Sequence, residues 1–237
     1  MGVSIALSGN TVLVAGSGFI TATHGAFQES STYNWVTRID LAGRSHLNAV
    51  LNAASRSGGA IAPGELVIAS GVGFSPDALV IFDGASVVPV SRSGTDLLAP
   101  STLSGVATVQ VTSGGVSTNS LTVPVVDAAP AIFTNQSSSV PGGIRNADGT
   151  LNSPGNPAAR GSVITILGTG LGVRPEAVTV YFDGFASSAL LYGAAPGSPG
   201  VFQMTAVVPP QVPVSGRVSV YLTAGQVASQ VVTMAVK

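Results

Sequence analysis

The stretch that decides the fold is GELVIASGVGF, residues 64–74, because it recurs as GSVITILGTGL at residues 161–171. In both copies, a short run of apolar and β-branched residues lies between a leading glycine and a Gly-x-Gly turn. Such residues favour strands, and glycine accepts the turn conformations that end them. The chain therefore contains the same strand-and-turn unit twice, which predicts an internal structural repeat.

Two further pairs of motifs extend this repeat. Residues 81–84 (IFDG) match residues 181–184 (YFDG), and residues 114–119 (GGVSTN) match residues 225–230 (GQVASQ). The spacing between the copies grows from the first motif to the last, so the second copy carries small loop insertions.

The composition is that of a folded, weakly charged chain of 237 residues. Charged residues make up 8% and the formal net charge is −1, which excludes the basic footprint of a nucleic-acid binder and the charge excess of a disordered chain. Apolar residues make up 45%, enough for a sizeable core, yet no apolar run is long enough for a membrane-spanning helix. Without cysteine there is no disulfide framework, thiolate metal site or thiol nucleophile.

Short apolar runs separated by turn residues continue along the whole chain, as in β-sandwiches. We therefore predict an all-β protein with two tandem immunoglobulin-like sandwiches, residues 46–130 and 131–237, preceded by a short β segment, residues 1–45. One short helical turn is expected around residues 47–54. Strands are expected at residues 3–7, 11–15, 35–39, 66–69, 78–82, 107–112, 120–126, 163–167, 177–182, 202–208, 217–223 and 229–236.

Two of the motifs resemble immunoglobulin-like families. Residues 71–74 (GVGF) with residues 81–84 (IFDG) resemble the IPT/TIG module, in which one strand ends at a Gly-x-Gly turn and a later strand ends at an Asp-Gly turn. Residues 146–154 (NADGTLNSP) and 156–161 (NPAARG) make residues 145–237 similar to a C-terminal domain of large secreted bacterial proteins of unknown function.

The N-terminal segment resembles a different family. Residues 23–28 (THGAFQ) and 35–40 (WVTRID) are similar to the last part of a bacterial β-propeller repeat, of which this segment holds too few strands for a whole blade. None of the three resemblances implies a catalytic residue.

Motifs for catalysis or cofactor binding are few. The Gly-x-Gly turns lack the third glycine and the following helix of a dinucleotide-binding loop, so we interpret them as backbone turns. His24 and His46 have no serine elbow and no third metal ligand near them in sequence, so we interpret them as surface histidines. We therefore expect no catalytic site, no metal site and no cofactor, and predict that the protein is not an enzyme.

Three other motifs stay open as alternatives. Residues 146–149 place oxygen donors before a glycine as a calcium loop does, but residues 151–160 hold no acid that would join Asp148 as a ligand. Asn135 begins a glycosylation sequon. Tyr181 and Tyr192 are candidates for an aromatic platform that binds carbohydrate.

The scarcity of charge leaves small polar and apolar residues to cover the surface, and such surfaces favour association. The N-terminal segment has too few strands for a core of its own, and an unpaired strand edge readily pairs with another chain. We therefore predict a non-catalytic structural protein, extracellular or on a bacterial cell surface, that forms a filament or stalk with identical chains through β-strand contacts. The residues expected to make this contact are Val3, Ile5, Leu7, Val12 and Val14.

The alternative function is an accessory module at the C-terminus of a larger secreted protein, binding polysaccharide or another protein. Residues 1–10 lack the basic and apolar regions of a signal peptide. Either a leader is missing from this sequence, or the chain is the C-terminal part of a longer secreted protein.

Overall fold

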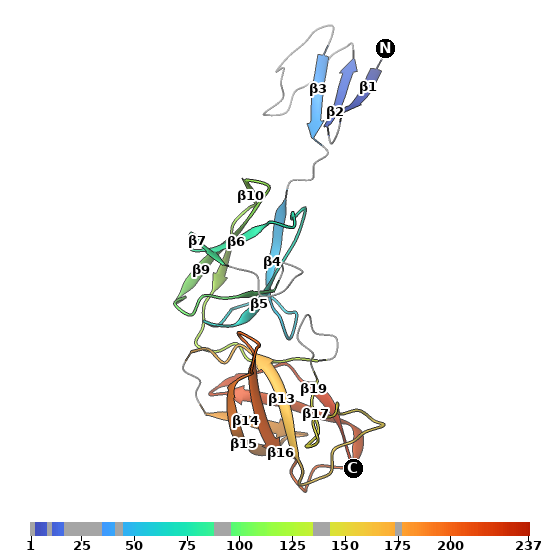
Figure 1. Ribbon diagram of the computed structural model, residues 1–237, viewed down its shortest axis with the longest axis vertical. Coiled ribbons are helices and arrows are strands. Elements are labelled where there is room, and N and C mark those ends of the chain that lie inside the picture. Colours follow the sequence, from blue (N-terminus) through green and yellow to red (C-terminus); the bar gives the residue numbers. More distant parts are fainter. Residues whose placement is uncertain are drawn as a thin grey trace. The chain divides into compact units, whose positions relative to one another are not determined.

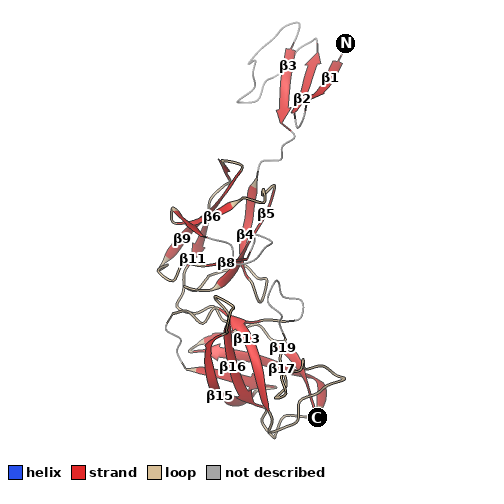
Figure 2. Cartoon of the chain, in the orientation of Figure 1, coloured by secondary structure: helices blue, strands red, loops and turns tan. Residues whose placement is uncertain are grey.

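The computed structural model describes residues 3–8, 11–16, 35–40, 45–87, 96–134, 143–173 and 177–237. Every regular element in these ranges is a β-strand, as Figure 2 shows, and the strands pair antiparallel in four sheets. The largest of them has eight strands and forms both sheets of the second sandwich, which the long strand β15 (Phe185–Ala194) joins. The predicted all-β class is therefore confirmed. None of the described residues forms a helix that is long and apolar enough to cross a membrane. The chain divides into two compact units, residues 1–45 and residues 46–237.

The N-terminal unit is a three-stranded antiparallel sheet with the order β1-β2-β3. Its strands are β1 (Val3–Ser8), β2 (Thr11–Gly16) and β3 (Trp35–Asp40). β1 and β2 form a hairpin in which Ile5 lies opposite Val14 and Leu7 lies opposite Val12. His24 and the rest of the propeller-like motif at residues 23–28 lie outside the described residues.

The larger unit begins with a sandwich of two small sheets around an apolar core that includes Leu47, Phe82 and Val109. One sheet has the order β4-β5-β8, and the other has β10-β9-β6-β7 with β11 also on β9. The strands are β4 (His46–Asn52), β5 (Leu66–Val72), β6 (Leu79–Phe82), β7 (Ala85–Val87), β8 (Asp96–Leu98), β9 (Val106–Ser113), β10 (Val116–Ser117) and β11 (Leu121–Pro124).

The helical turn predicted around residues 47–54 is wrong, because this stretch forms β4 and pairs with β5. The pairing register shifts between Leu47 and Ala49, as at a β-bulge. The bulge brings Leu47 and Val50, three positions apart, into the same core. An apolar spacing of three is also the spacing of one helical turn, which explains the error.

The second sandwich, coloured yellow to red in Figure 1, has a core that includes Ile164, Phe182 and Met204. β15 is long and shifts register between Ala189 and Leu191, so its first half pairs with β14 and its second half with β16. The strands are β12 (Ala131–Ile132), β13 (Val163–Thr169), β14 (Val178–Phe182), β15 (Phe185–Ala194), β16 (Phe202–Val207), β17 (Ser215–Ala224), β18 (Val227–Ala228) and β19 (Val232–Val236).

Equivalent side-chain amides tie together the two sheets of each sandwich. Asn119 accepts a hydrogen bond from the Leu47 N–H (2.9 Å) and donates one to the Leu47 carbonyl (2.9 Å). Gln230 does the same for Ile132, with distances of 3.1 and 2.7 Å. Each amide thus binds the main-chain N–H and carbonyl of one residue in the first strand of its sandwich, as a neighbouring strand would otherwise do. The match of these two residues in the sequence repeat therefore has a common structural cause.

The Asp-Gly turns are equivalent as well. Asp83 and Asp183 both have left-handed main chains, with φ of 48° and 45°. Their carboxylates accept hydrogen bonds from main-chain N–H groups across the sheet, Thr108 for Asp83 (2.7 Å) and Ser219 for Asp183 (2.8 Å). Both aspartates thus stabilise a turn.

The two sandwiches share a third apolar cluster. Main-chain groups also meet across this junction: the Leu66 N–H donates to the Thr169 hydroxyl (2.8 Å), which in turn donates to the Gly200 carbonyl (2.6 Å). The Asn52 amide donates to the Ala129 carbonyl (3.2 Å) in the connecting segment. The buried members of the cluster are Ala53, Ala54, Leu66, Ala131, Phe133, Ala195 and Val201.

Candidate functional site

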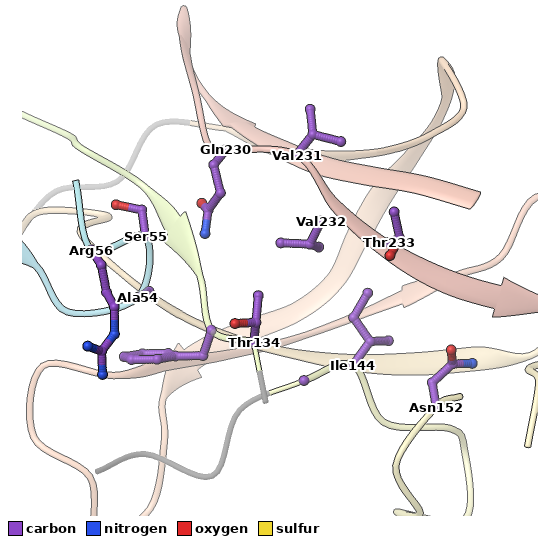
Figure 3. Close-up of a pocket in the computed structure, with 12 residues that line it drawn as sticks. Ala54, Ser55, Arg56, Thr134, Ile144, Asn152, Gln230, Val231, Val232 and Thr233 are labelled. Carbon is purple, nitrogen blue, oxygen red and sulfur yellow. The ribbon is translucent and has the colours of Figure 1, made fainter. Parts of the chain in front are cut away.

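A cavity of about 760 Å³ opens beside this junction (Figure 3). The first sandwich contributes the loop at residues 54–56. The second contributes residues 133–134, residues 143–144, Asn152 and residues 230–233, where β19 begins at Val232. Four separate parts of the second sandwich and one loop of the first therefore form its wall.

Among the described lining residues Arg56 is the one that carries a charge, and none of them is Asp, Glu, His or Cys. Its main chain is left-handed, with φ of 58°, a conformation that is uncommon for a residue with a side chain. The Arg56 N–H donates to the Asn52 carbonyl (2.9 Å), and the Asn52 N–H donates to the Ser57 carbonyl (2.9 Å), so a tight turn holds it there. Figure 3 shows the Arg56 side chain at the opposite end of the cavity from Asn152.

The two amide side chains in the wall are already engaged. Asn152 accepts from the Ala235 N–H (2.7 Å) and donates to the Ala235 carbonyl (2.9 Å). Gln230 makes both of its bonds to Ile132. Neither amide is therefore available to a ligand without loss of a bond within the protein.

The available polar groups lie on the main chain of β19. The bonds between Ala235 and Asn152 show that Ala235 directs its N–H and carbonyl away from β17. Main-chain groups alternate in direction along a strand, so Thr233 directs its own N–H and carbonyl to the same open edge. These groups of Thr233 have no hydrogen-bond partner within the described part of the chain. The cavity thus contains an unpaired strand edge, and among its described lining residues there is no acid, histidine or cysteine.

The residues predicted for assembly lie in the N-terminal sheet. Val3, Ile5 and Leu7 belong to β1, while Val12 and Val14 belong to β2. β2 is the central strand, so its main chain is paired on both sides, whereas β1 has one neighbour among the described residues. Their contact with another chain remains a prediction.

The structure does not bring Tyr181 and Tyr192 together. Tyr181 lies on β14 and stacks on Tyr221 of β17, with ring centroids 4.8 Å apart and planes 8° from parallel. Tyr192 lies on the second half of β15, opposite Met204. The predicted platform of these two tyrosines is therefore wrong. At Tyr192, β15 no longer pairs with β14 but with β16, in the opposite sheet of the sandwich.

The remaining predicted residues have structural surroundings or lie outside the description. The Asp148 carboxylate accepts from the Thr150 hydroxyl (2.5 Å) and from the Thr150 N–H (3.0 Å), and these hydrogen bonds hold the pKa of Asp148 below its usual value. No group of three acidic, histidine or cysteine residues that could hold a metal occurs among the described residues. His46 is exposed at the start of β4. Asn135 lies outside the described ranges.

One buried acid was not singled out from the sequence. Glu65 is completely buried beside the junction; its Oε2 accepts from the Ala62 N–H (2.7 Å), and its Oε1 has no hydrogen-bond partner among the residues that the structure describes. Burial raises the pKa of Glu65 to about 7. The only sequence signal was its position in the repeat, where the second copy has Ser162.

We expect Glu65 to make the protein less stable as the pH rises from 5 to 8. The folded state holds its proton up to pH about 7, whereas the unfolded carboxyl loses it near 4.5, so folding binds a proton in this range. The low pKa values of Asp77 and Asp148 affect stability only below this range. Urea midpoints at pH 5 and pH 8 measure the effect, and Glu65→Gln should reduce the difference. An equal difference in both proteins would contradict it.

One part of the chain is similar to a known domain family. Residues 150–235 match the IPT/TIG domain model. This match covers a little over a third of the chain and lies in the second sandwich, including most of β19. IPT/TIG is a non-catalytic domain. No curated protein matches the chain, and the propeller-like character of the N-terminal segment remains a prediction.

Several solved structures are similar to the chain. They include SGBP-B from the mixed-linkage glucan utilization locus of Bacteroides ovatus in complex with a mixed-linkage heptasaccharide (13% identity, 98% of this chain and 54% of that chain, TM-score 0.41). Domains 4–9 of the surface layer protein SbsC follow (15%, 95% and 35%, TM-score 0.29), as does a titin tandem of Ig domains (13%, 75% and 90%, TM-score 0.25). The chain thus spans about half of the first structure and a third of the second. TM-scores below 0.5 define neither the placement of the domains nor a function.

Proposed function

We propose that the chain is a structural, non-catalytic module of a filament or stalk outside a bacterial cell or on its surface. The observation that carries this proposal is the apolar cluster shared by the two sandwiches, to which Leu66 and Phe133 contribute fully buried side chains. A shared core with cross-junction hydrogen bonds holds two domains in one arrangement, as a stalk requires, whereas a flexible linker would not.

The N-terminal sheet would supply the contact between identical chains. Ile5 on β1 is 67% exposed, and the outer edge of β1 has no partner among the described strands. Unpaired edges of this kind pair with strands of other chains. A contact between unlike surfaces of successive copies makes an open polymer when the rotation does not close a ring.

Removal of residues 1–42 tests this function. We expect the intact chain to form regular polymers, visible by electron microscopy and by sedimentation, and the shortened chain to stay monomeric. The shortened chain keeps the whole compact unit at residues 46–237, so its circular dichroism should still show folded β-structure. Polymers that persist after the deletion, or an intact chain that stays monomeric at every concentration, would contradict the proposal.

The stacked pair Tyr181 and Tyr221 favours a second candidate, an accessory module that binds polysaccharide. Their strand neighbours Val180 and Leu222 are fully buried, so the two tyrosines lie on the outer face of the sheet. Thr179 lies opposite Thr223 on this face, next to the rings. Aromatic rings with hydroxyl groups beside them suit a neutral sugar. Monodisperse particles that a neutral polysaccharide retards in a native gel would favour this function over the first.

A further inference from the structure

β19 keeps a short stretch of its edge unpaired beside the cavity. Further along the strand the edge is covered: the Ala158 N–H donates to the Ala235 carbonyl (3.0 Å), and the Lys237 N–H donates to the Ala158 carbonyl (2.8 Å). Before that point only Thr233 and the preceding Val231 lie along the edge, and Val231 is 62% exposed. The opening is therefore limited at one end by Asn152 and its bonds to Ala235, and it fits a short extended segment.

The chain itself contains a strand that suits this edge. β1 reads VSIALS, with apolar residues at alternate positions and no charge. β3, at the other side of the same sheet, carries Arg38 and Asp40, and charged side chains discourage pairing at an edge. An uncharged strand matches a cavity in which Ile144 and Val232 are buried and Arg56 is the one charged residue of the described lining.

We infer that the open edge at Val231–Thr233, where β19 begins, accepts β1 of a second copy of this chain. The inference rests on the proposed assembly and names the surface that receives the N-terminal strand. The incoming main chain would pair with the N–H and carbonyl of Thr233, while its alternate apolar side chains would face the cavity. Each copy has one donor strand and one acceptor edge on different surfaces, so the contact continues from copy to copy and forms a polymer.

Thr233→Pro tests the acceptor edge with little harm to the fold. Proline removes the N–H of residue 233, which has no partner within the described part of the chain, and proline is tolerated at strand edges. Loss of one hydrogen bond to the incoming strand should raise the concentration needed for polymers roughly tenfold. Sedimentation across a concentration series measures this shift.

The matched control is Thr122→Pro in the first sandwich. The Pro124 carbonyl accepts from the Ile61 N–H (2.9 Å), so Thr122, two residues earlier, directs its N–H to an open edge as Thr233 does. We expect this variant to polymerise like the wild type. If both proline variants polymerise like the wild type, β19 is not the acceptor, but the proposed filament still stands. If both variants lose polymers equally, β19 is not the specific acceptor.

Disulfide trapping adds a direct test, since the chain has no cysteine of its own. Ile5→Cys and Thr233→Cys, made in separate chains and mixed under mild oxidation, should give a covalent dimer that contains one of each. A mixture of Ile5→Cys with Thr223→Cys should give far less of the mixed dimer. Equal yields of mixed dimer from the two mixtures, with polymers present, would overturn the proposal that β19 is the acceptor but not the proposed filament. A wild-type chain that never polymerises would overturn both proposals.

Discussion

Phe182→Ala should destabilise the protein by about 3–5 kcal/mol, the usual loss when a buried phenylalanine is truncated. Phe182 is completely buried in the core of the second sandwich. It is the last residue of β14 and lies opposite Val220 of β17, so a cavity at this position also weakens the packing of the neighbouring strand. Urea unfolding of the intact chain, followed by circular dichroism, measures the loss.

Two other phenylalanines provide the comparison. Phe82 occupies the matching position in the first sandwich and is 1% exposed, so Phe82→Ala should cost a similar amount. Phe185 lies directly after the Asp-Gly turn that Phe182 precedes, but it is 41% exposed. Phe185→Ala should therefore cost less than about 1 kcal/mol. A loss below 1 kcal/mol for Phe182→Ala would contradict the equivalence of the two copies.

The fold was largely predictable because its signals are local. Alternation of side chains, β-branched runs and Gly-x-Gly turns depend on neighbouring residues, and the repeat showed each signal twice. β15 was missed because it contains Ser187, Ser188 and Gly193 and changes partner at a bulge, which hides the alternation. β4 was mistaken for a helical turn because its bulge gives Leu47 and Val50 a spacing of three.

The candidate site was not predictable, because it depends on contacts between distant parts of the chain. Asn152 and Thr233, 81 positions apart in the sequence, meet within the second sandwich, and the packing of the two sandwiches adds Arg56 to the same cavity. The repeat did align Asn119 with Gln230, but nothing local indicates that each amide binds the first strand of its sandwich. The unpaired edge of β19 is a property of which strands meet, and it leaves no mark in the residue types.

Gly170→Ala should cost about 3 kcal/mol or more, because two effects add at this position. Gly170 has φ of 85°, a left-handed conformation that disfavours any residue with a side chain. A methyl group there would also overlap the carbonyl of Ala129, and the Ala129 N–H donates to the Gly170 carbonyl (2.8 Å). The glycine therefore lets the segment between the two sandwiches lie directly against the end of β13.

Gly184→Ala separates the two effects. Gly184 has nearly the same φ, 86°, but no atom lies within 4 Å of where its methyl group would be. Its substitution should therefore cost only the conformational part, about 1–2 kcal/mol. The excess for Gly170→Ala, measured by urea unfolding of both variants, reports the close contact of the connecting segment with β13. Equal losses would mean that this segment moves aside at little cost, and the Gly-x-Gly turn would then be needed for its backbone conformation alone.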